Sequence, residues 1–355
     1  MTGKVAVLGA GAWGTALGKL LAEKGNSVFL WSRRRELCDA VNATRENARY
    51  LPGAPIPANM SCTDDLRTAL QGAEMVVFVV PSHAMREVAR AAAPYLQGTG
   101  AGTEPGISVV SATKGIEVDS LLFMDEVLGQ ELPSHARDQL ATLSGPSFAK
   151  ELVNHLPTAV VIAAHDPAVR DPVMKRFHTP YLRTYASGDV AGVECGGALK
   201  NVIAIAAGAV DGMGFGHNTR AALITRGLAE IAQLAMARGG SALTLAGLAG
   251  MGDLVLTCTG ELSRNRTVGY ELGKGRTLGE ILAGLGHVAE GVRTAKSAYD
   301  LSKKLGVDMP ITSEVYSVLY EDKPVEKAVR DLMARELSYE FDPRAIARAR
   351  LRGPA

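Results

Sequence analysis

Short runs of apolar, often β-branched residues alternate with segments of helical periodicity through the first half of the chain. These runs predict strands over residues 4–8, 27–31, 75–79, 107–111, 141–144 and 159–163. The helical spacing predicts helices between them, including 14–24, 84–95 and 121–128. Strands that alternate with helices indicate a mostly parallel sheet covered by helices, and the uninterrupted apolar run at 75–80 is typical of a strand at its centre.

The pattern changes near Asp189. Beyond it the apolar positions recur with the period of a helix, and Ala, Leu and Gly dominate. Asn218 is placed to cap a helix, and Pro310 and Pro324 stand where further helices begin. We therefore expect an α/β domain over residues 1–189, an all-helical domain over 190–340 and a loosely ordered, arginine-rich tail over 341–355.

Composition agrees with two globular domains in one chain. The sequence has 355 residues, of which 47% are apolar and 21% charged, enough for a core in each domain. Lys and Arg number 38 against 37 Asp and Glu, a net charge of +1. A protein that binds nucleic acid needs a basic excess to neutralise phosphates, so we expect no nucleic-acid partner.

Cysteine spacing and the lack of leader-like segments favour a soluble, cytoplasmic protein. Cys38, Cys62, Cys195 and Cys258 are far apart in sequence and form no CxxC pair, so we expect no disulfide scaffold and no metal site. The first residues lack the apolar core of a signal peptide. The longest candidate for a membrane span, 202–210, is short of the ~18 apolar residues required, so none is expected.

A glycine-rich loop follows the first predicted strand. Gly9, Gly11 and Gly14 form a GxGxxG pattern around Ala12 and Trp13, between a strand and a helix. In this context the glycines allow a tight turn, a close approach of the backbone to a pyrophosphate and close packing of helix on strand. The loop therefore predicts a Rossmann-type dinucleotide site, with the phosphates at the start of the helix. The alternative is a glycine-rich turn without a ligand.

The end of the second strand bears on which dinucleotide binds. NAD-binding proteins commonly have Asp or Glu there to hold the ribose hydroxyls, whereas this chain has Ser32, Arg33, Arg34 and Arg35. Guanidinium groups attract a 2′-phosphate that a carboxylate would repel. We therefore expect NADP(H) to be accepted and preferred through Arg33, with Arg34 as a second candidate. The alternative is that these arginines begin the solvated face of a helix.

Polar residues follow other predicted strands, at the edge of the sheet where α/β proteins bind ligands. Lys114 comes after strand 107–111, and Gly145 and Ser147 come after strand 141–144. A lysine there suits a phosphate or a polarised carbonyl, and a turn before a helix offers free amides to an anion. The alternatives are an ordinary exposed lysine and a simple helix cap.

The helical half contains one unusual lysine. Lys200 stands near the start of CGGALKNVIAIA, a run of small and apolar residues from Cys195. Small residues allow close packing, so we expect this lysine in a cleft or interface, where partial desolvation lowers a lysine pKa toward the range for proton transfer. The alternative is an alkyl chain that reaches along the surface to solvent. Cys195 has no adjacent base and is interpreted as a small buried filler.

Three further segments carry candidate binding residues. Asp253 ends a glycine-rich approach. Ser263, Arg264 and Asn265 form a cluster of hydrogen-bond donors suited to phosphate oxygens, although a charged helix cap is the alternative. Glu290 is an isolated acid in a turn of small residues, for which the pattern alone suggests only a cap.

Together, these segments resemble the bacterial NAD(P)-dependent glycerol-3-phosphate dehydrogenase family. The matching motifs occur in order along nearly the whole chain: GAGAWGTAL, SATKGIE, LSGPSFAKE, ECGGALKNVIAIAAG, LAGMGD, ELSRNRTVG and VAEGV. Several motifs in a consistent order are far more specific than one glycine loop. The resemblance implies a Rossmann-type N-terminal domain and an all-helical C-terminal domain of the 6-phosphogluconate-dehydrogenase-like group.

The resemblance also implies a reaction, which is reversible hydride transfer between NAD(P)H and dihydroxyacetone phosphate. The product, sn-glycerol 3-phosphate, would feed phospholipid synthesis, and Lys200 would be the proton donor in the reduction. By motif, the substrate-binding residues are Lys114, Gly145, Ser147, Lys200, Asp253, Ser263, Arg264 and Asn265. The residues implied to bind NADP(H) or NAD(H) are Gly9, Gly11, Ala12, Trp13, Gly14, Arg33, Arg34, Lys114, Ala149, Arg264, Val288 and Glu290.

Two alternatives stay open. Hydroxyacid dehydrogenases and ketopantoate reductases share the glycine loop, a helical second domain and a catalytic lysine, but the donor cluster at 263–265 favours a phosphorylated substrate. A dinucleotide-sensing regulator without turnover would not need Lys200, Asp253 and Arg264 to converge. The apolar helices of the second half could pack within one subunit or between two, so a homodimer is also open.

Overall fold

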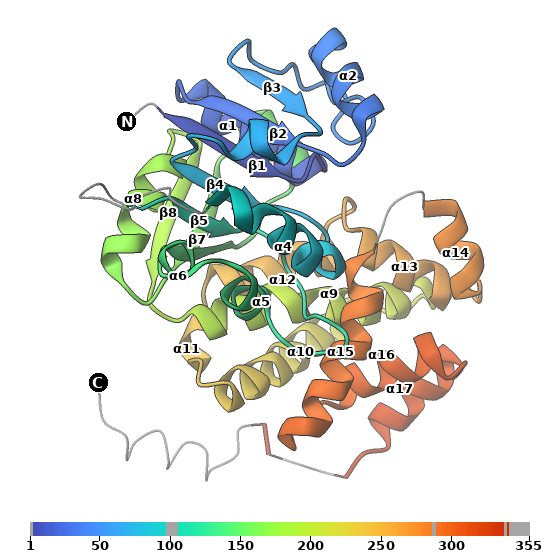
Figure 1. Cartoon of the computed structure of the whole chain (residues 1–355). Helices are drawn as coiled ribbons and strands as arrows, with labels where there is room; N and C mark the ends of the chain where they lie inside the picture. Colours follow the sequence, from blue (N-terminus) through green and yellow to red (C-terminus); the bar gives the residue numbers. More distant parts are fainter. Residues whose placement is uncertain (1–2, 97–105, 286–288, 337–338, 341–355) are drawn as a thin grey trace.

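The structure is a computed structural model that describes residues 3–96, 106–285, 289–336 and 339–340. Within these residues, eight strands form one sheet in the order β3-β2-β1-β4-β5-β6-β7-β8. Figure 1 shows this sheet in the upper part of the view, with the C-terminal helices below it. The strands are β1 (Lys4–Leu8), β2 (Ser27–Trp31), β3 (Met60–Thr63), β4 (Met75–Phe78), β5 (Ser108–Ser111), β6 (Leu140–Ser144), β7 (Thr158–Ala163) and β8 (Leu182–Ser187).

The sheet is mostly parallel, as the alternation of strands and helices predicts. The strands from β1 to β6 pair in parallel, β6 and β7 pair antiparallel, and β7 and β8 are parallel again. The central strand β4 is buried at every position. The strands predicted from the sequence do not include β3 and β8, which are the two edges of the sheet. Both are only partly buried, so they leave no continuous apolar run to detect.

Helices cover both faces of the sheet. Leu17 and Leu20 of the first helix pack with one set of buried side chains, and Val88 and Met124 belong to a second set. The helix predicted over 121–128 begins later than expected, because Leu121 has a φ of 60° and cannot start a right-handed helix. These helices are α1 (Ala12–Glu23), α2 (Arg35–Thr44), α3 (Leu66–Leu70), η1 (Ser82–Ala84), α4 (Met85–Leu96), α5 (Met124–Glu131), α6 (Ser134–Arg137), α7 (Ala149–Val153) and α8 (Pro167–Phe177).

The rest of the described chain is helical and is built around α9 (Val190–Gly212), which packs against α10, α12, α13 and α15. Asp189 caps α9 by accepting a hydrogen bond from the amide of Gly192, at 2.8 Å. The other helical elements are α10 (His217–Ala237), α11 (Ala242–Leu245), η2 (Leu248–Gly252), α12 (Asp253–Thr259), α13 (Arg264–Gly273), α14 (Leu278–Leu285), α15 (Glu290–Leu305), α16 (Pro310–Tyr320) and α17 (Val325–Met333).

Helix starts in this half agree in part with the sequence. Pro310 is the first residue of α16, and Pro324 immediately precedes α17. The prediction that Asn218 caps a helix is wrong, because α10 starts at His217 and Gly216 occupies the cap. The predicted tail lies outside the described residues.

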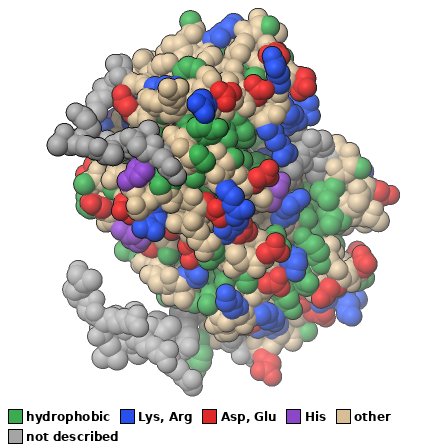
Figure 2. Space-filling model, viewed as in Figure 1, with side chains coloured by type: hydrophobic (Ala, Val, Ile, Leu, Met, Phe, Trp, Pro, Cys, Tyr) green, Lys and Arg blue, Asp and Glu red, His purple; other side chains and the backbone are tan. Residues whose placement is uncertain are grey.

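α9 is long and apolar enough to cross a membrane by length and composition, but 89% of its most apolar window is buried inside the protein. It is therefore the core helix of the helical half. On the surface, Lys and Arg side chains are interspersed with Asp and Glu over the face shown in Figure 2, in line with a net charge of +1.

Glycines bring α13 into direct backbone contact with α9. A Cβ on Gly269 of α13 would overlap the carbonyl oxygen of Ile205, and a Cβ on Gly208 of α9 would overlap that of Arg266. Neither neighbour is the end of a flexible side chain, so the helices would have to separate to admit a methyl group. These glycines therefore set how closely the two helices approach.

We predict that Gly269→Ala lowers the free energy of unfolding by about 1–3 kcal/mol, because the added methyl group overpacks the interface. Gly279→Ala is the matched control, since Gly279 is an exposed helical residue and a Cβ added there would have nothing within 4 Å. It should leave stability unchanged or raise it slightly. Urea unfolding measures both variants, and equal stability of the two would contradict the packing argument.

Candidate active site

The glycine loop after β1 has the geometry that a dinucleotide site requires. Gly9 has a φ of +126°, and a Cβ there would lie 2.5 Å from the carbonyl oxygen of Val79. A Cβ on Gly14 would overlap the carbonyl oxygen of Gly9, whereas Gly11 has nothing within 4 Å. The loop thus combines a tight turn, close packing and one open position where a phosphate can approach the backbone.

The N-terminus of α1 opens onto the same loop. Gly11 is the cap and offers no side chain, and the first turn contains no acidic residue, so the first amides of α1 are available to an anion. Trp13 is half-buried against the core. Asn47 supports the loop from outside, because its buried amide donates to the carbonyl of Ala10 at 3.0 Å and to Thr15 Oγ1 at 2.7 Å. Asn47 is not among the site residues predicted from the sequence.

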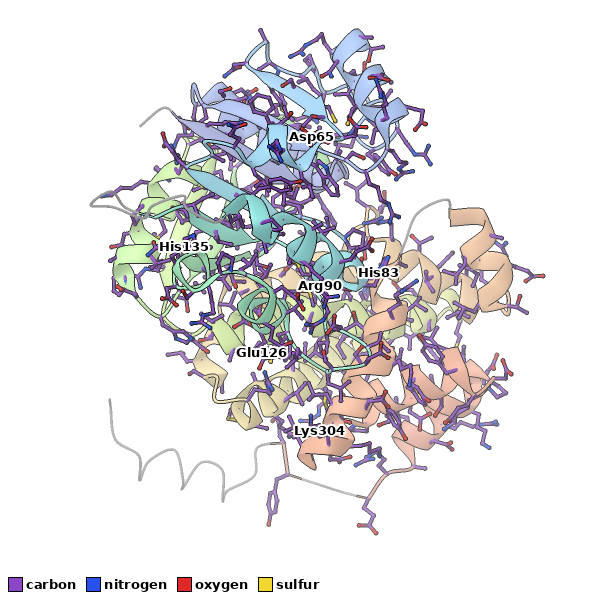
Figure 3. The ribbon with its side chains drawn as sticks, in the orientation of Figure 1. Asp65, His83, Arg90, Glu126, His135 and Lys304 are labelled. Carbon is purple, nitrogen blue, oxygen red and sulfur yellow. The ribbon has the colours of Figure 1, made fainter. Side chains whose placement is uncertain are left out.

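The two candidate arginines after β2 differ in their surroundings. The Arg34 guanidinium donates to the hydroxyl of Tyr50 and lies 5.6 Å from the centre of its ring. Arg33 is exposed and makes no ion pair or hydrogen bond within the described residues. The pKa of His83, which Figure 3 labels on η1, is lowered first by burial and then by the charge of Arg293. The charge of Arg33 adds a smaller effect in the same direction. Arg33 is therefore the freer cation of the two.

One buried carboxylate joins three segments at the centre of the site. Asp253, at the start of α12, is fully buried. Its carboxylate accepts a hydrogen bond from Lys200 Nζ of α9 and another from Lys114 Nζ, at 2.6 Å, from the loop after β5. Thr257, one turn along α12, accepts from Lys200 at 2.9 Å. The cleft position predicted for Lys200 agrees with this network, whereas Thr257 had no signal in the sequence beyond its place on the same helix face as Asp253.

The electrostatics of this network favour proton transfer at Lys200. Burial lowers the pKa of Lys200 to about 8, with Lys114 acting in the same direction and Asp253 opposing both. The surface alternative for Lys200 is wrong, since it is only 8% exposed. An ammonium with such a pKa gives up a proton near neutral pH far more readily than an ordinary lysine.

The loop after β6 closes one side of the network. Gly145 has a φ of +134°, and its carbonyl accepts hydrogen bonds from Lys114 Nζ and Ser147 Oγ, each at 3.0 Å. The alternative of Ser147 as a helix cap is wrong, because α7 starts at Ala149 and Phe148 occupies the cap. Ser147 and Ala149 are half-buried, so both stay partly accessible from the loop.

The predicted donor cluster at 263–265 divides into two kinds of residue. The buried Ser263 caps α13 by accepting from the amide of Arg266 at 3.3 Å. The Asn265 amide donates to Asn201 Oδ1 at 2.9 Å, and its oxygen accepts from the amide of Gly291 at 2.9 Å. Arg264, the first residue of α13, is exposed and has no ion pair within the described residues. Ser263 therefore caps α13 and Asn265 holds three helices together, while Arg264 remains available.

Glu290 ties the helical half to the sheet. It is the first residue of α15, and its carboxylate accepts a hydrogen bond from Ser82 Oγ at 2.7 Å, just beyond β4. Ser82 follows the central strand, so this contact crosses between the two halves near the site. Val288, predicted beside it, lies outside the described residues.

The cysteines are buried. Cys195 and Cys258 lie in the helical core, where burial raises the pKa of each thiol, that of Cys258 to about 12. Cys38 and Cys62, although far apart in sequence, place their free thiols side by side. Within the described residues, no three His, Cys, Asp or Glu side chains are grouped as metal ligands.

Comparison with known proteins agrees with this geometry. Residues 4–170 match the model of the NAD-dependent glycerol-3-phosphate dehydrogenase N-terminus, and residues 189–330 match that of its C-terminus. The chain belongs to this family. It is 54% identical over 333 residues to the glycerol-3-phosphate dehydrogenase [NAD(P)+] of Geobacter metallireducens, covering 94% of this chain and 97% of that one. It is an oxidoreductase.

Solved structures separate this family from its structural neighbours. The glycerol-3-phosphate dehydrogenase of Coxiella burnetii is 39% identical, with a TM-score of 0.87 over 94% of this chain and 99% of that one. A putative 2-dehydropantoate 2-reductase from Enterococcus faecalis is 15% identical, with a TM-score of 0.50 over 92% and 99%. The second likeness concerns the fold alone. The prediction of a Rossmann-type domain followed by a helical domain is thus confirmed.

Asp253→Asn tests the buried network. The substitution leaves the buried Lys200 and the half-buried Lys114 without their carboxylate, so we expect the free energy of unfolding to fall by about 3–5 kcal/mol. The control is Asp308→Asn, whose pair with Arg335 has side chains exposed by 72% and 50% and should change stability by less than about 1 kcal/mol. Urea unfolding at neutral pH compares them. Similar losses would show that the network contributes no more than a surface pair.

Proposed function

We propose that this chain catalyses the reversible reduction of dihydroxyacetone phosphate to sn-glycerol 3-phosphate with NADPH or NADH, and that Lys200 is its acid–base residue. The observation that carries this is the contact of Lys200 and Lys114 with the fully buried Asp253, at the carboxyl ends of β5 and β6. A non-catalytic sensor has no need for such a costly arrangement of buried charges.

The glycine loop and its surroundings fit a nicotinamide dinucleotide. The open position at Gly11 and the amides of α1 suit a pyrophosphate, and the free guanidinium of Arg33 suits a 2′-phosphate. When bound, the nicotinamide supplies or accepts the hydride. We assign the cofactor contacts to Gly9, Gly11, Ala12, Trp13, Gly14, Arg33, Arg34, Lys114, Ala149, Arg264 and Glu290, and to Val288 by motif alone.

In the reduction, Lys200 donates a proton to the carbonyl oxygen of the substrate as this becomes an alcohol; in the oxidation it accepts that proton. Asp253 and Thr257 hold the ammonium in place through their hydrogen bonds. Lys114 adds a second positive charge beside the developing alkoxide, which a water-poor site makes more effective. Asp253 holds both ammonium groups next to each other, because each of them donates to its carboxylate.

A second anchor point suits the phosphate of the substrate. Arg264 and the first amides of α13 offer charged and neutral donors at one helix end, where Ser263 and Asn265 fix the backbone. Gly145 and Ser147 form the opposite wall at the loop after β6. A phosphate held away from the reacting carbon orients the ketone, so binding energy from this handle contributes to turnover.

The proposed roles divide between the two halves of the chain. We place the boundary at Asp189, with residues 1–189 for the dinucleotide, 190–340 for substrate and catalysis, and the arginine-rich tail beyond. The product, sn-glycerol 3-phosphate, would supply phospholipid synthesis. Cytoplasmic location stays a prediction, which cell fractionation tests. Assembly as a homodimer also stays a prediction, which sedimentation tests.

Lys200→Met tests the proton-transfer role. The turnover number should fall at least about a hundredfold while NADPH still binds, because the acid is lost and the glycine loop is untouched. In the unmodified enzyme, reduction should slow as pH rises through about 8, where Lys200 loses its proton, and the variant should lack this inflection. The assay follows nicotinamide absorbance with dihydroxyacetone phosphate.

The control for this substitution is Lys296→Met, at a lysine of α15 whose side chain is 41% exposed and pairs with Asp300 on the same helix. It removes one ammonium group of the same size outside the buried network, so turnover should stay near that of the unmodified enzyme. Near-normal turnover of Lys200→Met would refute the role of Lys200.

Arg33→Ala tests the basis of cofactor preference. Loss of a guanidinium that contacts a 2′-phosphate should raise the dissociation constant for NADPH at least about tenfold and change that for NADH little. Arg35→Ala is the control, since Arg35 is an exposed neighbour on α2 that pairs with Asp39. Fluorescence titration of both cofactors provides the comparison, and equal weakening of the two would remove Arg33 from the argument.

A further inference from the structure

A small cavity lies behind Lys114, where the ends of β5 and β6 meet the first turns of α9. Its wall includes Lys114 from the loop after β5, Thr142 and Ser144 from β6, and Glu194 and Gly197 from α9. Gly197 makes room for it, because a Cβ there would lie 2.7 Å from Ser144 Oγ and 3.4 Å from Lys114 Cγ. The cavity therefore adjoins the reaction site through Lys114.

The cavity wall is rich in buried polar atoms. Thr142 and Ser144 are each 2% exposed and Glu194 is 7% exposed. Within the described residues, Thr142 Oγ1, Ser144 Oγ and Glu194 Oε2 have no hydrogen-bond partner. Leaving three such atoms unsatisfied costs free energy for each of them, and a polar space of this kind is where proteins bind internal water.

Glu194 is suited to donate a hydrogen bond into this space. Its other oxygen accepts from the amide of Asp125 at 3.1 Å. Burial, and then the neighbouring carboxyl of Asp125, raise the pKa of Glu194 well above its ordinary value. A nearby cation, Arg238 immediately after α10, pairs with Glu126 at 2.5 Å, the residue labelled on α5 in Figure 3. Burial and the Asp125 carboxyl both favour the protonated carboxyl of Glu194, which can donate a hydrogen bond into the cavity.

We propose that this cavity binds ordered water and that Glu194, acting through that water, is a positioning residue for the reaction. A water with two to four protein partners would link Glu194 to Thr142 and Ser144 and so hold α9 against β6. α9 continues from Glu194 to Lys200, and β6 continues from Thr142 into the loop that contains Ser147. Lys114 forms part of the cavity wall. The positioning role rests on the proposed function, whereas the water site does not.

The kinetic test compares Glu194→Leu with Glu194→Gln. The leucine variant cannot bond to water, so its turnover number should fall at least about tenfold through misplacement of the reacting groups, with the dissociation constant for NADPH unchanged. Glutamine keeps a donor and an acceptor and should restore turnover to within about threefold. Glu230→Gln is the matched control: Glu230 is also buried, bonds to the amides of Ile311 and Thr312, and should affect stability without changing turnover.

A crystal structure of the full chain gives a readout independent of activity. Water density should bridge Glu194 to Thr142 and Ser144 in the unmodified protein and be lost or displaced in Thr142→Val, which keeps the shape of threonine and folds more safely than a leucine at 194. Absence of density in the unmodified protein overturns the water site. Turnover unchanged in Glu194→Leu and Thr142→Val overturns the positioning role. If the unmodified protein fails to oxidise NADPH with dihydroxyacetone phosphate, the proposed function fails while the density still decides the water site.

Discussion

The arrangement of the two halves depends on one buried carboxylate. Asp253 accepts hydrogen bonds from ammonium groups of the loop after β5 and of α9, so it joins the sheet to the helices at the proposed reacting centre. Buried charges are tolerated only when their partners are closely placed, which restricts how α9 and α12 can sit against the sheet. Two ammonium groups share one carboxylate, so the cluster has a net positive charge, which suits the anionic substrate of the proposed reaction.

Backbone contacts give α9 the position that this cluster needs. Glycines let α13 touch α9 directly, and Asn265 bonds to Asn201 of α9 and to the amide of Gly291 at the start of α15. Three helices are thus fixed to one another beside Lys200. The small residues that surround Lys200 in the sequence serve close approach between helices, and the burial that lowers the pKa of the lysine is a consequence of the same approach.

Much of this could be predicted from the chain alone, for reasons that differ between elements. β1, β2 and β4 are buried strands with strong apolar runs, and the glycine loop lies directly after one of them. The edge strands β3 and β8 lack that signal. At the site, Lys200 and Asp253 stood out by residue type and context, but Thr257, Asn201 and Asn47 act through neighbours distant in sequence. No local pattern marks a threonine or asparagine whose partner is set by tertiary packing.

The attachment of the glycine loop by Asn47 has a consequence for changing the coenzyme. Asn47 lies beyond α2, and its side-chain amide holds Ala10 and Thr15, so the glycine loop is anchored without any contact from Arg33. Arg34, in contrast, bonds to Tyr50, whose amide donates to the carbonyl of Asn47. A substitution at Arg33 therefore removes no contact of the glycine loop. On the proposed function, Arg33 sets the coenzyme selectivity and Asn47 anchors the loop, so a designed switch of coenzyme can change Arg33 provided that Asn47 is retained.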